Sequence, residues 1–341
     1  MPRPANRWAS IRAVATAFLC AAAWAPVAAQ QPLTQELRNV APPSRWQAQV
    51  DSLDDAFRSR MLTANDPRSN WIAGQLDQGD IQSQVRHFAV ARVAAPDNKL
   101  YLATLATACM QPVQPRLPEC EAVDRLADWA TRDRDNGWPS LLLADRARQH
   151  GNAEAMLAYL QQAAAQPRFV EYWEAGSLEI WEAVRAMPLD GDDAAKLELA
   201  VMYAMSRSLA WPTAARATCL GTGERTPAVK SACAELGAAM RERGSTWMSR
   251  LIGGRMAQGN VASPQARADA ERKLASVRAQ IAACSRSTGS VLDGLEAADV
   301  ATRTKAVAEW DRWLRREAAV GEARACEERL VATSTAPSKA Q

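Results

Sequence analysis

The sequence has few of the residues on which common hydrolytic and metal chemistry depends. It contains only two histidines, His87 and His150, and it has no HExxH, GxSxG or glycine-rich phosphate motif. No two of its cysteines stand in CxxC spacing. These absences argue against a serine hydrolase triad, a zinc site and a nucleotide-binding loop. We therefore expect neither a metal nor a cofactor.

Long apolar runs are also missing beyond residue 30. The best candidate, residues 197–205, is far shorter than the roughly 20 apolar residues needed to cross a bilayer. We expect no stable membrane insertion once the N-terminal segment has been removed.

That N-terminal segment has the layout of a secretory signal peptide. Arg3, Arg7 and Arg12 precede an apolar stretch at 13–23, and small residues lead to a predicted cleavage after Ala29. Residues 1–29 are thus predicted to be a signal peptide and the mature protein to be periplasmic or secreted. Two alternatives are lipidation of Cys20 and an uncleaved signal anchor.

Removal of the signal peptide changes the charge balance. The whole chain has 41 Lys and Arg against 38 Asp and Glu, and the signal peptide holds three of the arginines and no acid. The mature chain would then be neutral overall, which gives no reason to expect nucleic acid or an anionic membrane as a partner.

The composition favours helix throughout. Alanine and arginine are abundant, whereas the alternating β-branched and aromatic residues of strands are scarce. We expect an all-α fold, an array of antiparallel helical hairpins resembling a short solenoid. Its predicted parts are a leader at 30–45, helical halves at 46–188 and 189–331, and a disordered tail at 332–341.

An even number of cysteines in an exported chain favours disulfides. Six would remain after cleavage and allow fifteen pairings: Cys109, Cys120, Cys219, Cys233, Cys284 and Cys326. We favour the local pairs Cys109–Cys120 and Cys219–Cys233, which leaves Cys284 for Cys326. A straight helix from Gly294 would carry Cys326 about 48 Å away, so that pair requires a helix break at 299–302 or at Gly321.

The two halves share an internal repeat, which predicts a duplicated helical unit. The block that begins at Arg132 and contains Trp138 and Arg146 recurs from Arg241 with Trp247 and Arg255. Tryptophan and arginine dominate binding hot spots, so these four residues are candidates for a protein-binding surface. The alternative is that the tryptophans dock their helices and the arginine stems cover them.

Residues 143–163 resemble one tetratricopeptide or Sel1-like repeat. Leu143, Ala144, Gly151, Leu160 and Ala163 occupy the leucine, small, turn-glycine, large apolar and alanine positions of that pattern. The resemblance implies stacked helix pairs that bind a peptide or protein.

Four glutamates between residues 169 and 187 offer a possible glycan-cleaving site. On one continuous helix Glu171, Glu174, Glu179 and Glu182 would share one face, opposite an apolar face. That pattern predicts an ordinary solvated acidic face.

Taken together, these features lead us to expect an exported protein-binding or scaffold protein of the bacterial cell envelope, with an unknown protein partner. The alternative is a cell-envelope hydrolase that cleaves glycans with carboxylates that the sequence does not identify.

Overall fold

A computed structural model describes residues 47–77, 79–111, 117–188, 192–207, 211–221, 223–295, 297 and 299–335. Within these ranges the protein is all-α, as predicted, and the only β-type pairing consists of isolated bridges. Among the described residues, no helix is both long and apolar enough to span a membrane. The predicted signal peptide, Cys20 and the leader lie outside the described residues.

The helices follow one another with short connections. In chain order they are α3 Gln47–Thr63, α4 Pro67–Leu76, α5 Ile81–Ala94, α6 Lys99–Ala108, α7 Pro118–Glu121, α8 Arg125–Arg132, α9 Gly137–Gln149, α10 Ala153–Ala165, α11 Trp173–Arg185, α12 Asp193–Ser206, α13 Trp211–Ala215 with the π-helical turn η2 Arg216–Leu220, α14 Pro227–Arg243, α15 Trp247–Asn260, α16 Pro264–Leu295, α17 Val300–Val320 and α18 Glu322–Thr335.

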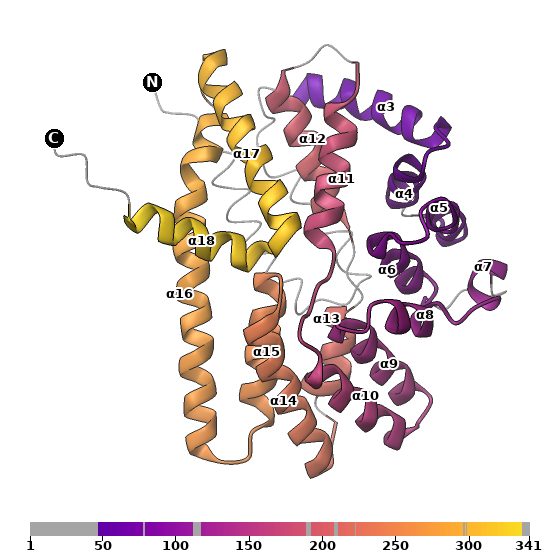
Figure 1. Cartoon of the computed structure of the whole chain (residues 1–341), viewed down its shortest axis with the longest axis vertical. Helices are drawn as coiled ribbons and strands as arrows, with labels where there is room; N and C mark the ends of the chain where they lie inside the picture. Colours follow the sequence, from indigo (N-terminus) through magenta and orange to yellow (C-terminus); the bar gives the residue numbers. More distant parts are fainter. Residues whose placement is uncertain are drawn as a thin grey trace.

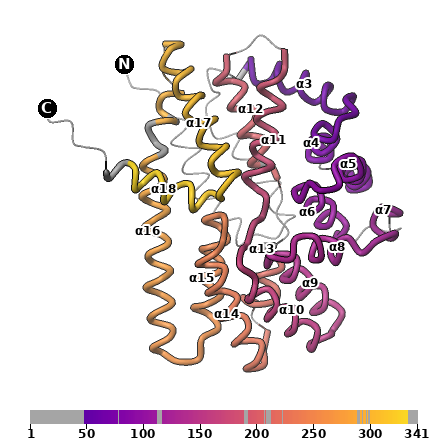
Figure 2. The backbone as a smooth tube through the Cα atoms, in the orientation of Figure 1, coloured from indigo at the N-terminus to yellow at the C-terminus, as the bar shows by residue number. Residues whose placement is uncertain are grey.

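Consecutive helices pair along much of the chain. Helices α9 and α10 pack together, as do α14 and α15, and α10 lies against α14. Figure 1 shows α3 to α7 along one side of the molecule and the long α16 along the other, with α14 and α15 at one end. In Figure 2 the chain returns through α17 and then crosses toward α16 as α18.

Close approach of α14 and α15 depends on glycine. A Cβ on Gly253 would lie 2.6 Å from both the main-chain nitrogen of Arg241 and the Cβ of Met240. A Cβ on Gly237 would lie 2.6 Å from the carbonyl oxygen of Gly253. Only a residue without a side chain lets the two backbones come this near.

Asp66 and Pro67 start helix α4. The carboxylate of Asp66 accepts a hydrogen bond from the Ser69 N–H at 3.0 Å, and Pro67 occupies the first turn. Proline suits that position because the first helical N–H groups have no partner within the helix.

Helices α7 and α8 are separate elements, because Asp124 caps the start of α8 with its carboxylate. A helix at 169–187 begins only at Trp173, after Tyr172 adopts a left-handed φ of 59°. Helix α18 runs to Thr335, so the predicted disordered tail begins too early; residues 336–341 lie outside the described part.

The hydrophobic core is shared between the two halves of the sequence. One cluster joins Phe57, Trp71 and Trp181 to Leu295 and Leu314. A second joins helices α6 and α8–α10 to α14 and α15. The boundary that we placed at residues 188/189 is therefore not a boundary between separate cores.

All three favoured disulfides are present. Cys109–Cys120, Cys219–Cys233 and Cys284–Cys326 have Cα–Cα distances of 5.5, 5.5 and 5.9 Å. The third pair is possible because the chain breaks twice, between α16 and α17 and again at Gly321. Gly321 has a φ of 88°, a conformation that favours glycine.

Candidate functional site

An extended segment, residues 166–172, runs between the starts of two equivalent helices. The Gly137 N–H donates to the Arg168 carbonyl at 2.9 Å, at the start of α9. The Ser245 N–H donates to the Phe169 carbonyl at 2.9 Å, just before α15. The Ala323 N–H then donates to the Ser245 carbonyl at 2.9 Å, at the start of α18. Three helix starts are thus linked side by side through main-chain hydrogen bonds.

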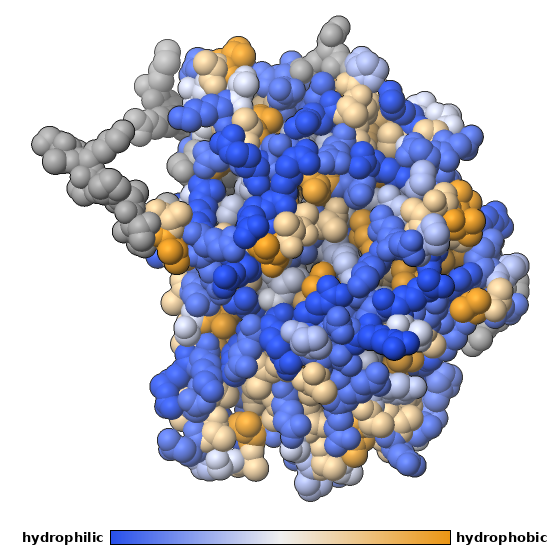
Figure 3. All heavy atoms as spheres, viewed as in Figure 1, coloured by the Kyte–Doolittle hydropathy of each residue, from blue (hydrophilic) through white to orange (hydrophobic). Residues whose placement is uncertain are grey.

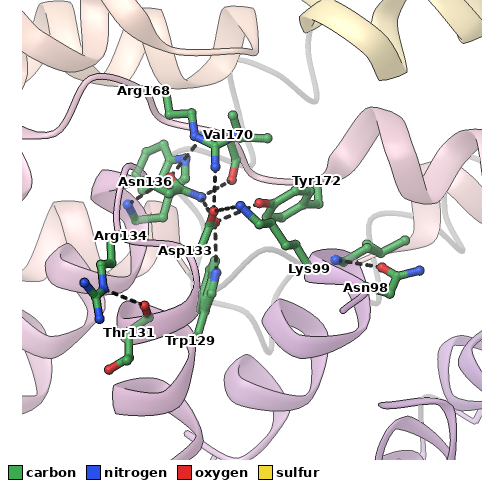
Figure 4. A network of polar contacts seen from close by, with 12 residues as sticks. Asn98, Lys99, Trp129, Thr131, Asp133, Arg134, Asn136, Arg168, Val170 and Tyr172 are labelled. Carbon is green, nitrogen blue, oxygen red and sulfur yellow. Dashed lines mark hydrogen bonds and ion pairs between the residues drawn. The ribbon is translucent and has the colours of Figure 1, made fainter. Parts of the chain in front are cut away.

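On one side of this segment lies a buried carboxylate, Asp133, shown in Figure 4. Its side chain is fully buried. It accepts hydrogen bonds from five side chains at 2.6–3.3 Å: Lys99, Trp129, Asn136, Arg168 and Tyr172.

Burial by itself would raise the pKa of Asp133, but the hydrogen bonds from Lys99, Asn136 and Tyr172 and the charge of Arg168 outweigh it and lower that pKa. The carboxylate is therefore ionised and satisfied by its donors. Lys99 and Arg168 remain about 40% exposed, with side-chain values of 42% and 37%. We interpret this network as a structural contact that fixes the extended segment to α6 and α8.

On the other side of the segment lies a group of carboxylates with a different character. We call it the glutamate cluster and define it as Glu171, Glu174, Glu317 and Glu322. Glu171 and Glu174 are only 8% and 4% exposed, while Glu317 and Glu322 are partly buried. Its members come from the extended segment, α11, α17 and α18.

The hydrogen bonds of the cluster come from neutral donors. The hydroxyls of Ser245 and Thr246 donate to Glu171 at 2.6 and 3.0 Å. The Trp247 N–H donates to Glu322 at 2.9 Å, and the Glu322 N–H donates to Glu174 at 3.1 Å. Two of these carboxylates thus cap the starts of α15 and α18, where the helix dipole favours negative charge.

Burial nevertheless dominates the electrostatics of the cluster. Burial, followed by the charge of Glu174, raises the pKa of Glu171 to about 8. Burial raises the pKa of Glu322 to about 7, although the Trp247 N–H opposes this. The pKa values of Glu174 and Glu317 are also raised, mainly by burial. Carboxyl groups with such pKa values hold protons near neutral pH, as general acids do.

One of the two guanidinium groups that face the cluster belongs to Arg207. Arg207 donates to the main-chain carbonyl of Trp173 at 2.8 Å and lies over the rings of Trp71 and Trp173, 5.2 and 5.0 Å from their centroids. Burial lowers its pKa to about 10, and Glu174 opposes that shift. Arg207 is held by aromatic rings and carbonyl groups, so its charge is only partly available to the carboxylates.

The structure corrects the prediction of a solvated acidic face for Glu171 and Glu174. Glu171 precedes α11 and points to the start of α15, because the left-handed Tyr172 breaks the helical register. Glu179 and Glu182 do lie outside the cluster. They pair with Arg68, and Glu182 also pairs with Arg315 at 2.7 Å.

The candidate binding residues of the repeat are not together on an accessible surface. Trp138 and Trp247 are 1% and 4% exposed and belong to two different core clusters. Arg146 is partly exposed and forms a bidentate pair with Asp124 at 2.8 and 2.9 Å, and Arg255 is exposed. The tryptophans are therefore inaccessible to a partner in this conformation.

The described residues contain no group of three or more His, Cys, Asp or Glu side chains arranged to hold a metal ion. The proximity of the glutamates could not be found in the sequence, because Glu171 and Glu322 are far apart along the chain. Comparison with known proteins gives no match to any family model, curated protein or solved structure.

Proposed function

We propose that this protein is an exported protein-binding or scaffold protein of the bacterial cell envelope, and that the outer face of α5 contacts its partner. Export rests on the signal-like N-terminal segment, and the three disulfides are in keeping with an oxidising compartment.

The observation that carries this proposal is an apolar strip on α5. Val90 and Val93 are 50% and 80% exposed, and Arg86 and Ala94 are exposed on the same helical face. Figure 3 shows apolar side chains gathered over α5 at one edge of the molecule. An exposed apolar strip with an arginine beside it is typical of a surface that a partner covers.

Site-specific photo-crosslinking in the native host envelope tests this proposal. A photoreactive residue at Val93 is expected to give a discrete adduct, which the second substitution Val90→Asp removes without changing the circular dichroism spectrum. The matched control is a photoreactive residue at Val331, which is 63% exposed on α18. Equal labelling from both positions would count against the α5 surface.

A second candidate function, a hydrolase that cleaves envelope glycans, is favoured by the glutamate cluster alone. Glu171 is buried with a raised pKa, as a general acid requires, and Glu174 is a second carboxylate nearby. Release of soluble fragments from purified cell walls would support this function, provided that Glu171→Gln and Glu174→Gln each abolish it. Absence of release by the wild-type protein would remove it.

A further inference from the structure

The start of α18 contacts α15 and α11 through members of the glutamate cluster, in addition to the main-chain hydrogen bond from Ala323 to Ser245. Gly321 lies against Ser245, where a Cβ would come within 2.9 Å of the Ser245 Cβ. Glu322 then joins α15 through the Trp247 N–H and joins α11 through the carboxylate of Glu174. Glu171 adds two more hydrogen bonds to the turn before α15.

The charges that face this contact do not balance. The extended segment and α11 contribute Glu171 and Glu174, α17 contributes Glu317, and α18 contributes Glu322 and Glu327. The facing cations are Arg207, at the end of α12, and Arg250, on α15. Arg250 pairs with Glu327 at 2.6 Å, and Arg207 is engaged with carbonyl groups and rings. On α16, the neighbouring contribution is Cys284, which is bound to Cys326.

Asp133 provides the contrast within the same molecule. That carboxylate is fully buried, but Lys99 and Arg168 donate to it directly. The glutamate cluster receives hydroxyl and main-chain N–H donors instead. Ionising all four of its carboxyl groups would place like charges together in a poorly hydrated space, which is strongly unfavourable.

We propose that the glutamate cluster is a proton-operated clasp, which holds the start of α18 on α15 and α11 while it retains its protons and releases that contact when it ionises. The pKa values of Glu171 and Glu322, raised to about 8 and about 7, place the transition near neutral and mildly alkaline pH. The Cys284–Cys326 disulfide keeps α18 attached to α16 throughout, so the opening is local. This inference requires neither the proposed partner nor an enzymatic substrate.

Hydrogen exchange with mass spectrometry on the full mature chain tests the clasp. Exchange is followed at pH 5.5, 7.0 and 8.5 and corrected for the rise of intrinsic exchange with pH. The amides at 245–247 and 322–326 are expected to lose at least tenfold in protection between pH 5.5 and 8.5. The amides of α9 are expected to keep theirs.

Two neutral variants distinguish the clasp from general alkaline loosening. Glu171→Gln and Glu322→Gln imitate the protonated carboxyl group, so each is expected to retain protection at pH 8.5. The matched control, Glu235→Gln, changes an exposed glutamate on α14 and should behave as wild type. Protection that is independent of pH in the wild type, or a loss that is unchanged in both variants, would overturn the proposal. If one variant does not fold, the wild-type profile and the other variant still decide it.

Discussion

The hydroxyl of Tyr172 donates to the carboxylate of Asp133 at 2.7 Å, although Tyr172 has the only left-handed φ among the non-glycine residues that the structure describes. Its main chain redirects the polypeptide into α11, and its side chain fixes the same residue to α8 through Asp133. The hydrogen bond to Asp133 therefore holds the strained main chain of Tyr172 in place, directly after Glu171, whose carboxylate contacts the turn before α15.

Tyr172→Phe should therefore destabilise the protein. It removes one hydrogen bond to an ionised, buried group, which is worth about 1.5–3 kcal/mol. Urea unfolding followed by circular dichroism measures this loss. Tyr159→Phe, at a partly buried tyrosine on α10, serves as the control and should change stability by less than about 0.5 kcal/mol.

Asp133→Asn should cost more, about 3 kcal/mol, because breaking a buried ion pair leaves its partners without compensation. Lys99 and Arg168 can regain water, which keeps the loss at the lower end of the usual range. The pKa of Asp133 is lowered in the folded protein, so its contribution is present above its ordinary value of 3.8 and is lost as the pH falls further. Acid unfolding of the wild type and the variant should converge below that pH; parallel curves would contradict this assignment.

The glutamate cluster predicts the opposite dependence. Its folded-state pKa values are raised, from 4.5 to about 8 for Glu171, so the folded state binds protons more tightly than the unfolded chain. This contribution is fully present below pH 4.5 and is lost as the pH rises to about 8. Because one unit of pKa corresponds to about 1.4 kcal/mol, we expect the free energy of unfolding to fall by at least about 2 kcal/mol between pH 5.5 and 8.5. Glu171→Gln should reduce this fall in the free energy of unfolding with pH, as measured by urea unfolding, whereas Glu235→Gln should leave it unchanged.

The disulfides should differ in their contributions according to the loops that they close. Cys284–Cys326 spans 42 residues, against 14 for Cys219–Cys233 and 11 for Cys109–Cys120. Chain-entropy arguments give about 4 kcal/mol for the longest loop and about 3 kcal/mol for each of the others. Paired Cys→Ala variants compared under non-reducing conditions test this order. Loss of the longest loop should be the most damaging, and a reversed order would indicate that packing dominates.

Two glycines on α15 should respond in opposite directions to alanine. Gly253→Ala places a methyl group against Arg241 and Met240 of α14 and should cost about 1–3 kcal/mol through overpacking. For Gly259 the nearest atom to a new Cβ is Leu220 Cδ2 at 4.0 Å, so Gly259→Ala should stabilise the helix by up to about 1 kcal/mol. Thermal unfolding of both variants provides the comparison, and losses of equal size would contradict the close approach.

The sequence was sufficient to predict elements whose signals are local. Helices Pro227–Arg243 and Ala153–Ala165 begin directly after capping residues, Thr226 and Asn152, that are visible in the sequence. The Cys284–Cys326 pair could be reached by elimination, and the geometry of a straight helix then required a break at 299–302 or at Gly321. The structure has one break between α16 and α17 and another at Gly321.

The candidate site could not be predicted, for two physical reasons. A non-glycine residue with a left-handed φ has no reliable sequence signal, so Tyr172 was placed inside a helix and the orientation of Glu171 was wrong. The burial of Glu174 depends on Glu322, which is 148 positions away. Helical periodicity describes one helix at a time and contains no information on which distant segment covers it.

The linkage of three helix starts by residues 166–172 also determines where the chain can be altered. The opposite ends of the hairpins take no part in that linkage: the turn at Gly151 and Asn152 is exposed, as are Ala262 and Ser263 between α15 and α16. A fluorescent label, an affinity tag or a short inserted peptide at either turn would leave the three linked helix starts undisturbed. Insertions are therefore expected to be tolerated at these two turns, whereas an insertion within residues 166–172 would disrupt the contacts between the two halves of the sequence.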